Sequence, residues 1–270
     1  MAEIIAVINQ KGGSGKTTTC VNLGAGLAEA GQRVLIIDLD PQRNATLHLL
    51  GKEKAMSLWQ NSKTVYDVLA KDCPATEAVA DTSAPGVKVL PSHISLAGAD
   101  LELNVIGREK ILRDKLRPLA GEFDYILIDC SSSIGVLTLN ALCAAHSVIV
   151  TLQAEYLALE GMSQLINTLE LVRQRLEWPV EFMGALITFY DQRKLLCQQV
   201  ARRAEEHFKG QVFRTKIRDN VKLAEAPSHG IPAMLYDPVC HGTEDYRNLT
   251  QEVMDYVETR TRRQPIGAVR

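Results

Sequence analysis

Apolar residues occur along this chain in short continuous runs that alternate with longer stretches of helical periodicity. Short continuous apolar runs are typical of strands buried on both faces, as in a parallel sheet covered by helices. The predicted strands span residues 4–8, 33–38, 87–90, 123–129, 147–152 and 182–188. The predicted helices span residues 18–30, 96–119, 133–144, 157–177 and 191–208. This alternation predicts an α/β fold with a doubly wound, mostly parallel sheet and helices on both faces.

The pattern predicts a single domain over residues 1–258, because no long linker and no internal repeat interrupts it. Residues 51–63 are polar and irregular, so we expect a surface excursion there. Residues 259–270 are rich in arginine and contain a proline, which predicts a basic, flexible tail.

Three features bear on where the protein works. No apolar run approaches the ~18 residues of a membrane span, so we expect no membrane partner. A strand begins within the first residues, which leaves no room for a signal peptide. The six cysteines are scattered without a Cys-x-x-Cys pair, which is typical of reduced cysteines. We therefore expect a cytoplasmic protein.

A glycine-rich segment joins the first predicted strand to the first predicted helix. Such a loop turns backbone N–H groups and the positive end of the helix toward one anion, which is the geometry of a phosphate site. Lys16 would bind the β- and γ-phosphates, and the Thr17 hydroxyl would bind Mg²⁺. The predicted nucleotide-binding residues are Lys11, Gly12, Gly13, Ser14, Gly15, Lys16, Thr17 and Thr18.

The loop departs from the usual phosphate-loop pattern and adds a second lysine. Gln10 stands where that pattern has its first glycine, and Lys11 stands at the mouth of the loop. Lys16 can neutralise phosphates bound to its own subunit. Lys11 is placed to reach the γ-phosphate of a neighbouring molecule, as a lysine counterpart of an arginine finger. The alternative is a glycine-rich turn with a solvated lysine.

Aspartates stand at the ends of two predicted strands, where ligands bind in open α/β sheets. Asp129 and one of the pair Asp38 and Asp40 are candidate Mg²⁺ ligands, and the other of the pair would orient an attacking water. The residues alone do not settle which of the two has which task, and Asp38 is kept as a metal candidate. The alternatives are that Asp129 caps a helix and that Asp40 opens a turn.

The net charge is −2, so any contact with nucleic acid needs a local basic patch. Residues 193–222 hold nine Lys and Arg against three acids, an excess of six positive charges. Such an excess favours contacts with backbone phosphates, and no base-reading helix-turn-helix is evident. The alternative is an ordinary solvated helix face.

These motifs resemble the ParA/Soj branch of the MinD-like, deviant-Walker P-loop ATPases, and the resemblance runs nearly end to end. The segments that carry it are NQKGGSGKTTT (9–19), DLDPQRNAT (38–46), LAGA (96–99), QAEYLALEG (153–161) and EAPSHG (225–230). The resemblance implies an ATPase that uses ATP and Mg²⁺, forms an ATP-sandwich homodimer and binds DNA without sequence preference. It also implies a ParB-like activator or cargo adaptor, and a role in chromosome or plasmid partition on the nucleoid.

The resemblance also implies roles for individual residues. Lys11 would cross the dimer interface, and Lys16 would bind phosphate in its own subunit, so both count with Asp40 as catalytic candidates. Asp40 would position the hydrolytic water, Thr17 would bind Mg²⁺, and Asp129 would be the carboxylate of the second switch.

Candidate DNA contacts follow from the same resemblance. Arg193 and Lys222 occupy positions where the family carries DNA-contacting basic residues. Arg218, in the same basic stretch, is the third candidate.

The chain departs from the family pattern at three places. Arg43 stands where the family usually has Gly, and Ser131-Ser132-Ser133 stands where it usually has two prolines. Ile217-Arg218-Asp219-Asn220 replaces a usual Ile-Pro-Arg-Asn. Prolines stiffen a switch and serines loosen it, so we expect slow, partner-stimulated hydrolysis.

Other functions stay open at this point. The departures also suit a paralogue that positions another cargo on the nucleoid. A MinD-type membrane-associated ATPase would need an amphipathic C-terminal helix, whereas the end here is polar and contains Pro265. An iron-protein electron carrier would need cluster cysteines, and Cys130 lacks the required spacing. A scaffold without activity would not need the lysines and aspartates of the loop and strand ends.

Overall fold

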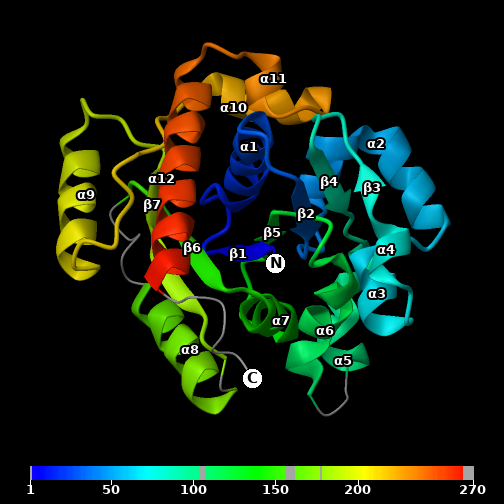
Figure 1. Ribbon diagram of the computed structural model, residues 1–270. Coiled ribbons are helices and arrows are strands. Elements are labelled where there is room, and N and C mark those ends of the chain that lie inside the picture. Colours follow the sequence, from blue (N-terminus) through cyan, green and yellow to red (C-terminus); the bar gives the residue numbers. More distant parts are fainter. Residues whose placement is uncertain (1, 104–106, 156–161, 177, 264–270) are drawn as a thin grey trace.

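The computed structural model describes residues 2–103, 107–155, 162–176 and 178–263. Within these residues, seven strands form one sheet in the order β3-β4-β2-β5-β1-β6-β7 (Figure 1). The neighbours pair in parallel, except that β3 is antiparallel to β4. The strands are β1 (Glu3–Ile8), β2 (Val34–Asp38), β3 (Ala80–Asp81), β4 (Val87–Leu90), β5 (Tyr125–Asp129), β6 (Ser147–Gln153) and β7 (Glu181–Thr188). The predicted fold class is confirmed.

Helices cover both faces of the sheet (Figure 1). Helix α12 lies along α1 on one face, and α7 packs beside β1 on the other. The α-helices are α1 (Lys16–Glu29), α2 (Asn44–Gln60), α3 (Val65–Ala70), α4 (Ala75–Ala78), α5 (Ala99–Glu102), α6 (Ile111–Leu116), α7 (Val136–Ala144), α8 (Met162–Arg175), α9 (Leu195–His207), α10 (Val221–Glu225), α11 (Ala233–Tyr236) and α12 (His241–Arg263).

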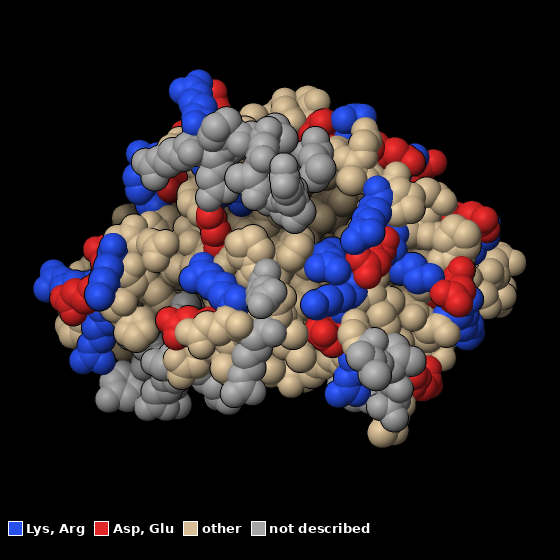
Figure 2. Space-filling model, turned by 60° about the horizontal axis from the view of Figure 1, so that its bottom comes forward, with Lys and Arg blue, Asp and Glu red and all other residues tan. Residues whose placement is uncertain are grey.

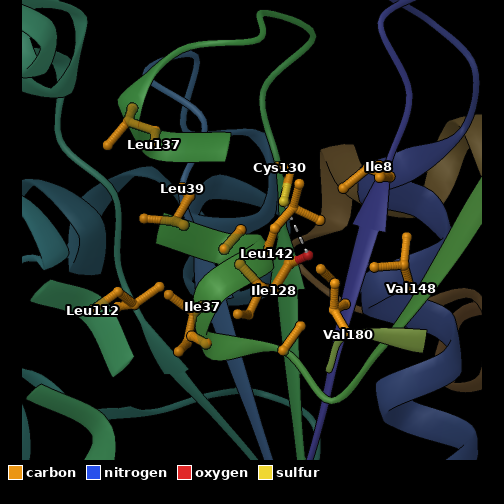
Figure 3. Packing of buried hydrophobic residues seen from close by; sticks show 14 of the residues in the cluster. Ile8, Ile37, Leu39, Leu112, Ile128, Cys130, Leu137, Leu142, Val148 and Val180 are labelled. Atoms are coloured by element: carbon orange, nitrogen blue, oxygen red, sulfur yellow. Dashed lines mark hydrogen bonds between the residues drawn. The ribbon is translucent and has the colours of Figure 1, made fainter. Parts of the chain in front are cut away.

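The strands feed two hydrophobic clusters, one on each face of the sheet. Successive side chains of a strand point to opposite faces, so Ile5 and Val7 of β1 join the cluster beneath α1 and α12, whereas Ala6 and Ile8 join the other. Figure 3 shows residues of this second cluster, to which β1 contributes Ile8, β5 contributes Ile128 and α7 contributes Leu142. Burial on both faces explains why the strands are continuous apolar runs in the sequence.

Two of the sequence expectations are wrong in detail. Residues 52–60 are helical and not irregular, although most of them are exposed as expected; they belong to α2, which is kinked at Gly51, where φ is 69°. The predicted single helix over 96–119 is broken into short α and 3₁₀ turns. Gly107 takes a left-handed conformation with φ 78° inside this stretch, which an uninterrupted helix does not allow.

The C-terminal boundary also differs from the expected one. Residues 259–263, which the sequence assigned to a basic tail, continue helix α12, and Arg260 makes an ion pair with Glu3. Residues 264–270 lie outside the described residues. The division into a domain over 1–258 and a tail stays a prediction.

The sheet topology brings the candidate site residues to one edge. The parallel register pairs Asp129 at the end of β5 with both Val7 of β1 and Asp38 of β2. The loop after β1 and the carboxylates after β2 and β5 therefore meet at the carboxyl ends of adjacent central strands. Among the described residues, none of the helices combines the length and apolar character that crossing a membrane requires.

Candidate functional site

The loop between β1 and α1 holds a conformation that depends on glycine. Gly13 and Gly15 have φ values of 72° and 87°, in the left-handed region that favours glycine. Thr188 Oγ1 at the end of β7 donates a hydrogen bond to Ser14 O (2.9 Å), and the hydroxyls of Ser14 and Thr151 are hydrogen-bonded at 3.0 Å. Strands β6 and β7 thus hold the loop from the side, a role for Thr151 and Thr188 that was not predicted from the sequence.

Helix α1 begins directly after this loop, with Gly15 at its N-cap and no side chain capping it. The first N–H groups of a helix have no partner within the helix and carry its positive dipole end. An uncapped N-terminus beneath a glycine loop is therefore suited to bind an anion.

Lys16 is folded back over the loop and is nine-tenths buried. Its Nζ donates to Lys11 O (3.2 Å) and to Ser132 Oγ (3.0 Å). Both acceptors are neutral, so the positive charge of the ammonium is not neutralised and can still bind a negatively charged oxygen. This placement agrees with a phosphate-binding role for Lys16.

Asp129 is fully buried, and both of its carboxylate oxygens lack a hydrogen-bond partner within the described part of the chain. Burial, and then the neighbouring charge of Asp38, raise its pKa well above the usual range, while the nearby Thr17 hydroxyl and Lys16 lower it. A buried carboxylate without partners is costly unless a cation compensates it.

Asp38 is equally buried but well satisfied. Its oxygens accept hydrogen bonds from Thr46 N (2.8 Å), Thr46 Oγ1 (2.7 Å) and Asp40 N (3.1 Å). Burial nevertheless raises its pKa to about 6. These bonds hold the chain between β2 and α2, so Asp38 has a structural task that the sequence analysis did not foresee; its metal role stays a prediction.

Asp40 lies at the rim of the site. Its carboxylate accepts a hydrogen bond from Gln42 N (2.9 Å), and its carbonyl accepts one from Ser92 Oγ (2.6 Å). Asp40, Gln42 and Asn44 line the same pocket as the loop, so the position required for orienting a water is available to Asp40.

The loop opens into two adjoining pockets. The first has a volume of about 490 Å³, and the second, of about 240 Å³, is more apolar and shares Gly15, Thr18 and Phe189 with it. The first pocket is lined by Gly12, Gly13, Ser14, Gly15, Lys16, Thr17, Thr18, Asp40, Gln42, Asn44, Leu47, His48, Ser132, Phe189 and Pro227. A pocket over a phosphate loop that continues into a more apolar one suits a ligand with a phosphate end and a less polar end.

The donors also fit magnesium. Thr17 offers a hydroxyl next to the two unpartnered oxygens of Asp129. No group of three or more His, Cys, Asp or Glu gathers into a cation cage in the described ranges. Mg²⁺ commonly takes one or two protein ligands and completes its shell with water and substrate phosphates, so this small donor set is the expected kind.

Lys11 points away from the site. Its ammonium makes an ion pair with Glu155, which follows β6, and the side chains are 44% and 50% exposed. Of the loop residues from Lys11 to Thr18, Lys11 alone is missing from the first pocket's lining. An outward-facing lysine at the mouth of the loop agrees with use between molecules. Glu155 as its partner was not predicted.

The three DNA candidates each carry ion pairs. Arg193 makes two hydrogen bonds with Asp191 (both 3.0 Å), and Lys222 bonds to Glu225 (2.9 Å), yet both basic side chains stay at least 41% exposed. Asp191 and Glu225 lie just outside residues 193–222, so they were not counted with the basic stretch. The local excess of positive charge is therefore smaller than the sequence count of six.

Arg218 differs from the other two. It bonds to both carboxylate oxygens of Asp245 and to Glu244 (2.7 Å), and it also reaches His241. These contacts fasten the segment before α10 to the start of α12. They leave Arg218 less suited to DNA than Arg193 or Lys222.

The described residues on the face below α5, α6 and α8 form no patch of a single charge sign (Figure 2). In Figure 2, Lys and Arg are interspersed there with Asp and Glu. Lys115 pairs with Asp72, and Arg113 and Arg117 pair with Asp114. Such mixing gives this face no extended positive field.

Comparisons with known proteins bear on this site. A family model described as an AAA domain matches residues 2–182. The chain is 47% identical over 254 residues to the sporulation initiation inhibitor protein Soj of Bacillus subtilis, which covers 94% of this chain and 98% of that protein. It is 46% identical over 255 residues to the chromosome partitioning protein ParA of Myxococcus xanthus, with 94% and 88% covered.

Solved structures give the same picture of the fold. The structure of a cobyrinic acid a,c-diamide synthase from Mycobacterium smegmatis, with a bound ATP analogue and magnesium, aligns with a TM-score of 0.85 at 35% identity and 96% coverage of each chain. MinD from Pyrococcus horikoshii, complexed with Mg-ADP, aligns with a TM-score of 0.75 at 25% identity, covering 96% of this chain and 98% of that one.

Proposed function

The chain belongs to the ParA/Soj family of P-loop ATPases, and from this premise we propose that it is an ATP-dependent dimerising switch for DNA partition. The observation that carries its nucleotide-binding part is the buried carboxylate of Asp129, which has no hydrogen-bond partner among the described residues and lies beside Thr17 and Lys16 at the uncapped start of α1. Relatives of this chain are named chromosome partitioning proteins, which supports a role in moving chromosomes or plasmids.

In the proposed reaction, the chain's own residues bind and orient. The backbone N–H groups of the loop and Lys16 hold the phosphates, and Thr17 and Asp129 hold Mg²⁺. The bound Mg²⁺ supplies positive charge that offsets the negative charge on the phosphates. Asp40 orients a water in line with the terminal phosphate, a task that requires position more than basicity.

The outward direction of Lys11 supports the proposed dimerisation. In the proposed ATP-bound pair, each Lys11 leaves Glu155 and contacts the nucleotide of the other subunit. An exposed ion pair of this kind contributes only about 0–1 kcal/mol, so exchanging it for a phosphate contact has a low cost.

DNA binding is proposed for Arg193 and Lys222, as contacts to backbone phosphates. Both basic side chains are exposed, and their carboxylate partners can be replaced by phosphates without leaving a buried charge. Affinity should then fall steeply with salt and show little sequence preference. A ParB-like activator would raise a basal hydrolysis rate that lies well below the ~10 per second of an ordinary enzyme.

A combined assay tests this function. Wild-type protein should bind ATP with Mg²⁺ and hydrolyse it slowly, and Lys16→Ala should do neither. In the Asp40→Ala variant, hydrolysis should stop while ATP binding persists. A protein that binds no ATP in the presence of Mg²⁺ would contradict the proposal.

The DNA step has its own test. The double variant Arg193→Glu, Lys222→Glu should lose retention on duplex DNA at low salt while keeping ATP affinity. A matched control is Arg117→Glu, Lys88→Glu, because these exposed basic residues also pair with acids and change the charge equally. Equal DNA retention in the two double variants would place the contact elsewhere.

A further inference from the structure

Ser132 lies in the turn between β5 and α7, in contact with the phosphate loop. Its Oγ accepts a hydrogen bond from Lys16 Nζ at 3.0 Å, and the residue lines the first pocket together with the loop. A Cβ added at Gly12 would lie 3.9 Å from the same Oγ. The Ser132 hydroxyl therefore lies against the loop, next to the ammonium group of Lys16.

The turn that carries Ser132 is fixed by its neighbours. The hydroxyls of Ser131 and Ser133 are hydrogen-bonded to each other at 3.0 Å, and Thr138 Oγ1 in α7 donates to Ser133 O at 2.5 Å. Of the three serines, Ser132 alone is a lining residue of the first pocket and a partner of Lys16. Its position is thus built into the structure of the turn.

The chemistry of the hydroxyl suits a phosphate. An oxygen that Lys16 binds as a charged partner comes to about 2.7–2.9 Å from Nζ, and Ser132 Oγ is already 3.0 Å from that atom. A hydroxyl can accept from Lys16 and donate to a phosphate oxygen at the same time. The proline usual in the family near this position has no such donor.

The geometry points to Ser132 as a specificity-determining residue that donates a hydrogen bond to the terminal phosphate of the nucleotide and so favours ATP over ADP. This inference rests on the proposed function and deepens it. In this structure the hydroxyl accepts a hydrogen bond from Lys16 Nζ. On ATP binding, Lys16 gains a charged oxygen as a second acceptor, and Ser132 keeps its bond to Lys16 while its own proton is donated to the terminal phosphate.

The test compares two affinities for each variant. Dissociation constants for ADP and for a non-hydrolysable ATP analogue are measured calorimetrically with Mg²⁺, in a Lys11→Ala background so that dimerisation does not contribute. The nucleotide-free state is common to both titrations, so loss of its Lys16–Ser132 bond cancels from the ATP-to-ADP affinity ratio. What remains in that ratio is the contact with the terminal phosphate.

Ser132→Ala should lower the ratio about tenfold, the usual effect of losing one hydrogen bond to a charged group. Ser132→Thr keeps a hydroxyl and should stay within about twofold of the parent protein. Ser57→Ala, an exposed serine of α2 that does not line the first pocket, is the control and should leave the ratio unchanged. Thermal melting of each variant verifies that it is folded.

The results separate two failures. If Ser132→Ala changes both affinities by the same factor, or changes neither, the hydroxyl serves only the nucleotide-free loop and the inference is wrong, although the proposed function stands. If the parent protein binds no ATP analogue, the proposed function fails and this inference fails with it.

Discussion

At the scale of single residues, the two buried aspartates differ in how the free-energy cost of burying a carboxylate is offset. Asp38 offsets its burial with three hydrogen bonds, whereas both oxygens of Asp129 lack a partner among the described residues. Burial raises the pKa of both carboxyls. The unfolded chain therefore binds fewer protons than the folded one, and each ionised carboxylate lowers stability as the pH rises above about 4.

We therefore expect Asp129→Asn to stabilise the nucleotide-free protein by about 1–2 kcal/mol at pH 7.5, because it removes an uncompensated buried charge. The gain should shrink as the pH falls toward 4, because the folded-state carboxyl is then protonated and the penalty of its buried charge is lost. Urea unfolding across this pH range measures it. Asp38→Asn is the matched control and should destabilise, since it disturbs the bonds from Thr46. If both variants are destabilised equally, the buried charge of Asp129 is already compensated by a partner, and the prediction is wrong.

Arg43 gives a second residue-scale prediction. Its backbone is left-handed (φ 61°), and its guanidinium lies 4.7 Å from the centre of the Trp59 ring. Arg43→Ala keeps the strain and loses the stacking, so it should destabilise by about 1 kcal/mol. Arg43→Gly loses both and should stay within about 0.5 kcal/mol of the parent. Chemical denaturation followed by Trp59 fluorescence measures both, and equal losses would contradict the strain argument.

At the scale of elements, the sequence predicts strands better than helix continuity. The buried strands are apolar on both faces, so each forms a continuous apolar run that is recognisable in the sequence. Among the strands of the described residues, only the two-residue β3 was missed. Helical periodicity in 96–119 continued across Gly107, whose left-handed conformation depends on tertiary context. In α2 the sequence pattern underestimated the helix. Few of its residues are buried, so the apolar periodicity that predicts a helix is weak, and the helix is kinked at Gly51.

Close packing of α1 against α12 yields an element-scale prediction. A Cβ at Gly26 would lie 2.2 Å from Thr250 Oγ1 and 3.0 Å from Met234 Cε. Gly26→Ala should therefore destabilise by about 1–3 kcal/mol through overpacking, despite the better helix propensity of alanine. Adding Thr250→Ala removes the colliding hydroxyl and should restore part of the loss. Thermal unfolding of the single and double variants gives the coupling, and strict additivity would argue against the clash.

For the whole molecule, the sequence located the site because parallel strands bring their carboxyl ends to one edge. Loop, Asp38 and Asp129 could be placed together on that ground alone. Some of the ion-pair partners could not be placed: Glu155, which pairs with Lys11, and Glu244 and Glu252, which pair with the basic stretch, come from distant segments of the chain. Charge counted along a sequence omits such partners, which is why the basic excess over 193–222 overstated the positive surface.

The state of the whole assembly depends on Lys11, which gives the last prediction. Because Lys11 is turned outward to Glu155, Lys11→Ala should leave ATP affinity of the single subunit within about twofold but abolish the ATP-dependent dimer. Sedimentation with an ATP analogue and Mg²⁺ measures this. Glu155→Gln is the matched control: it frees the ammonium from its partner, so dimerisation should persist or strengthen. If the Lys11→Ala protein dimerises like the parent, the two nucleotides are not shared across the interface, and DNA binding cannot be coupled to ATP through this lysine.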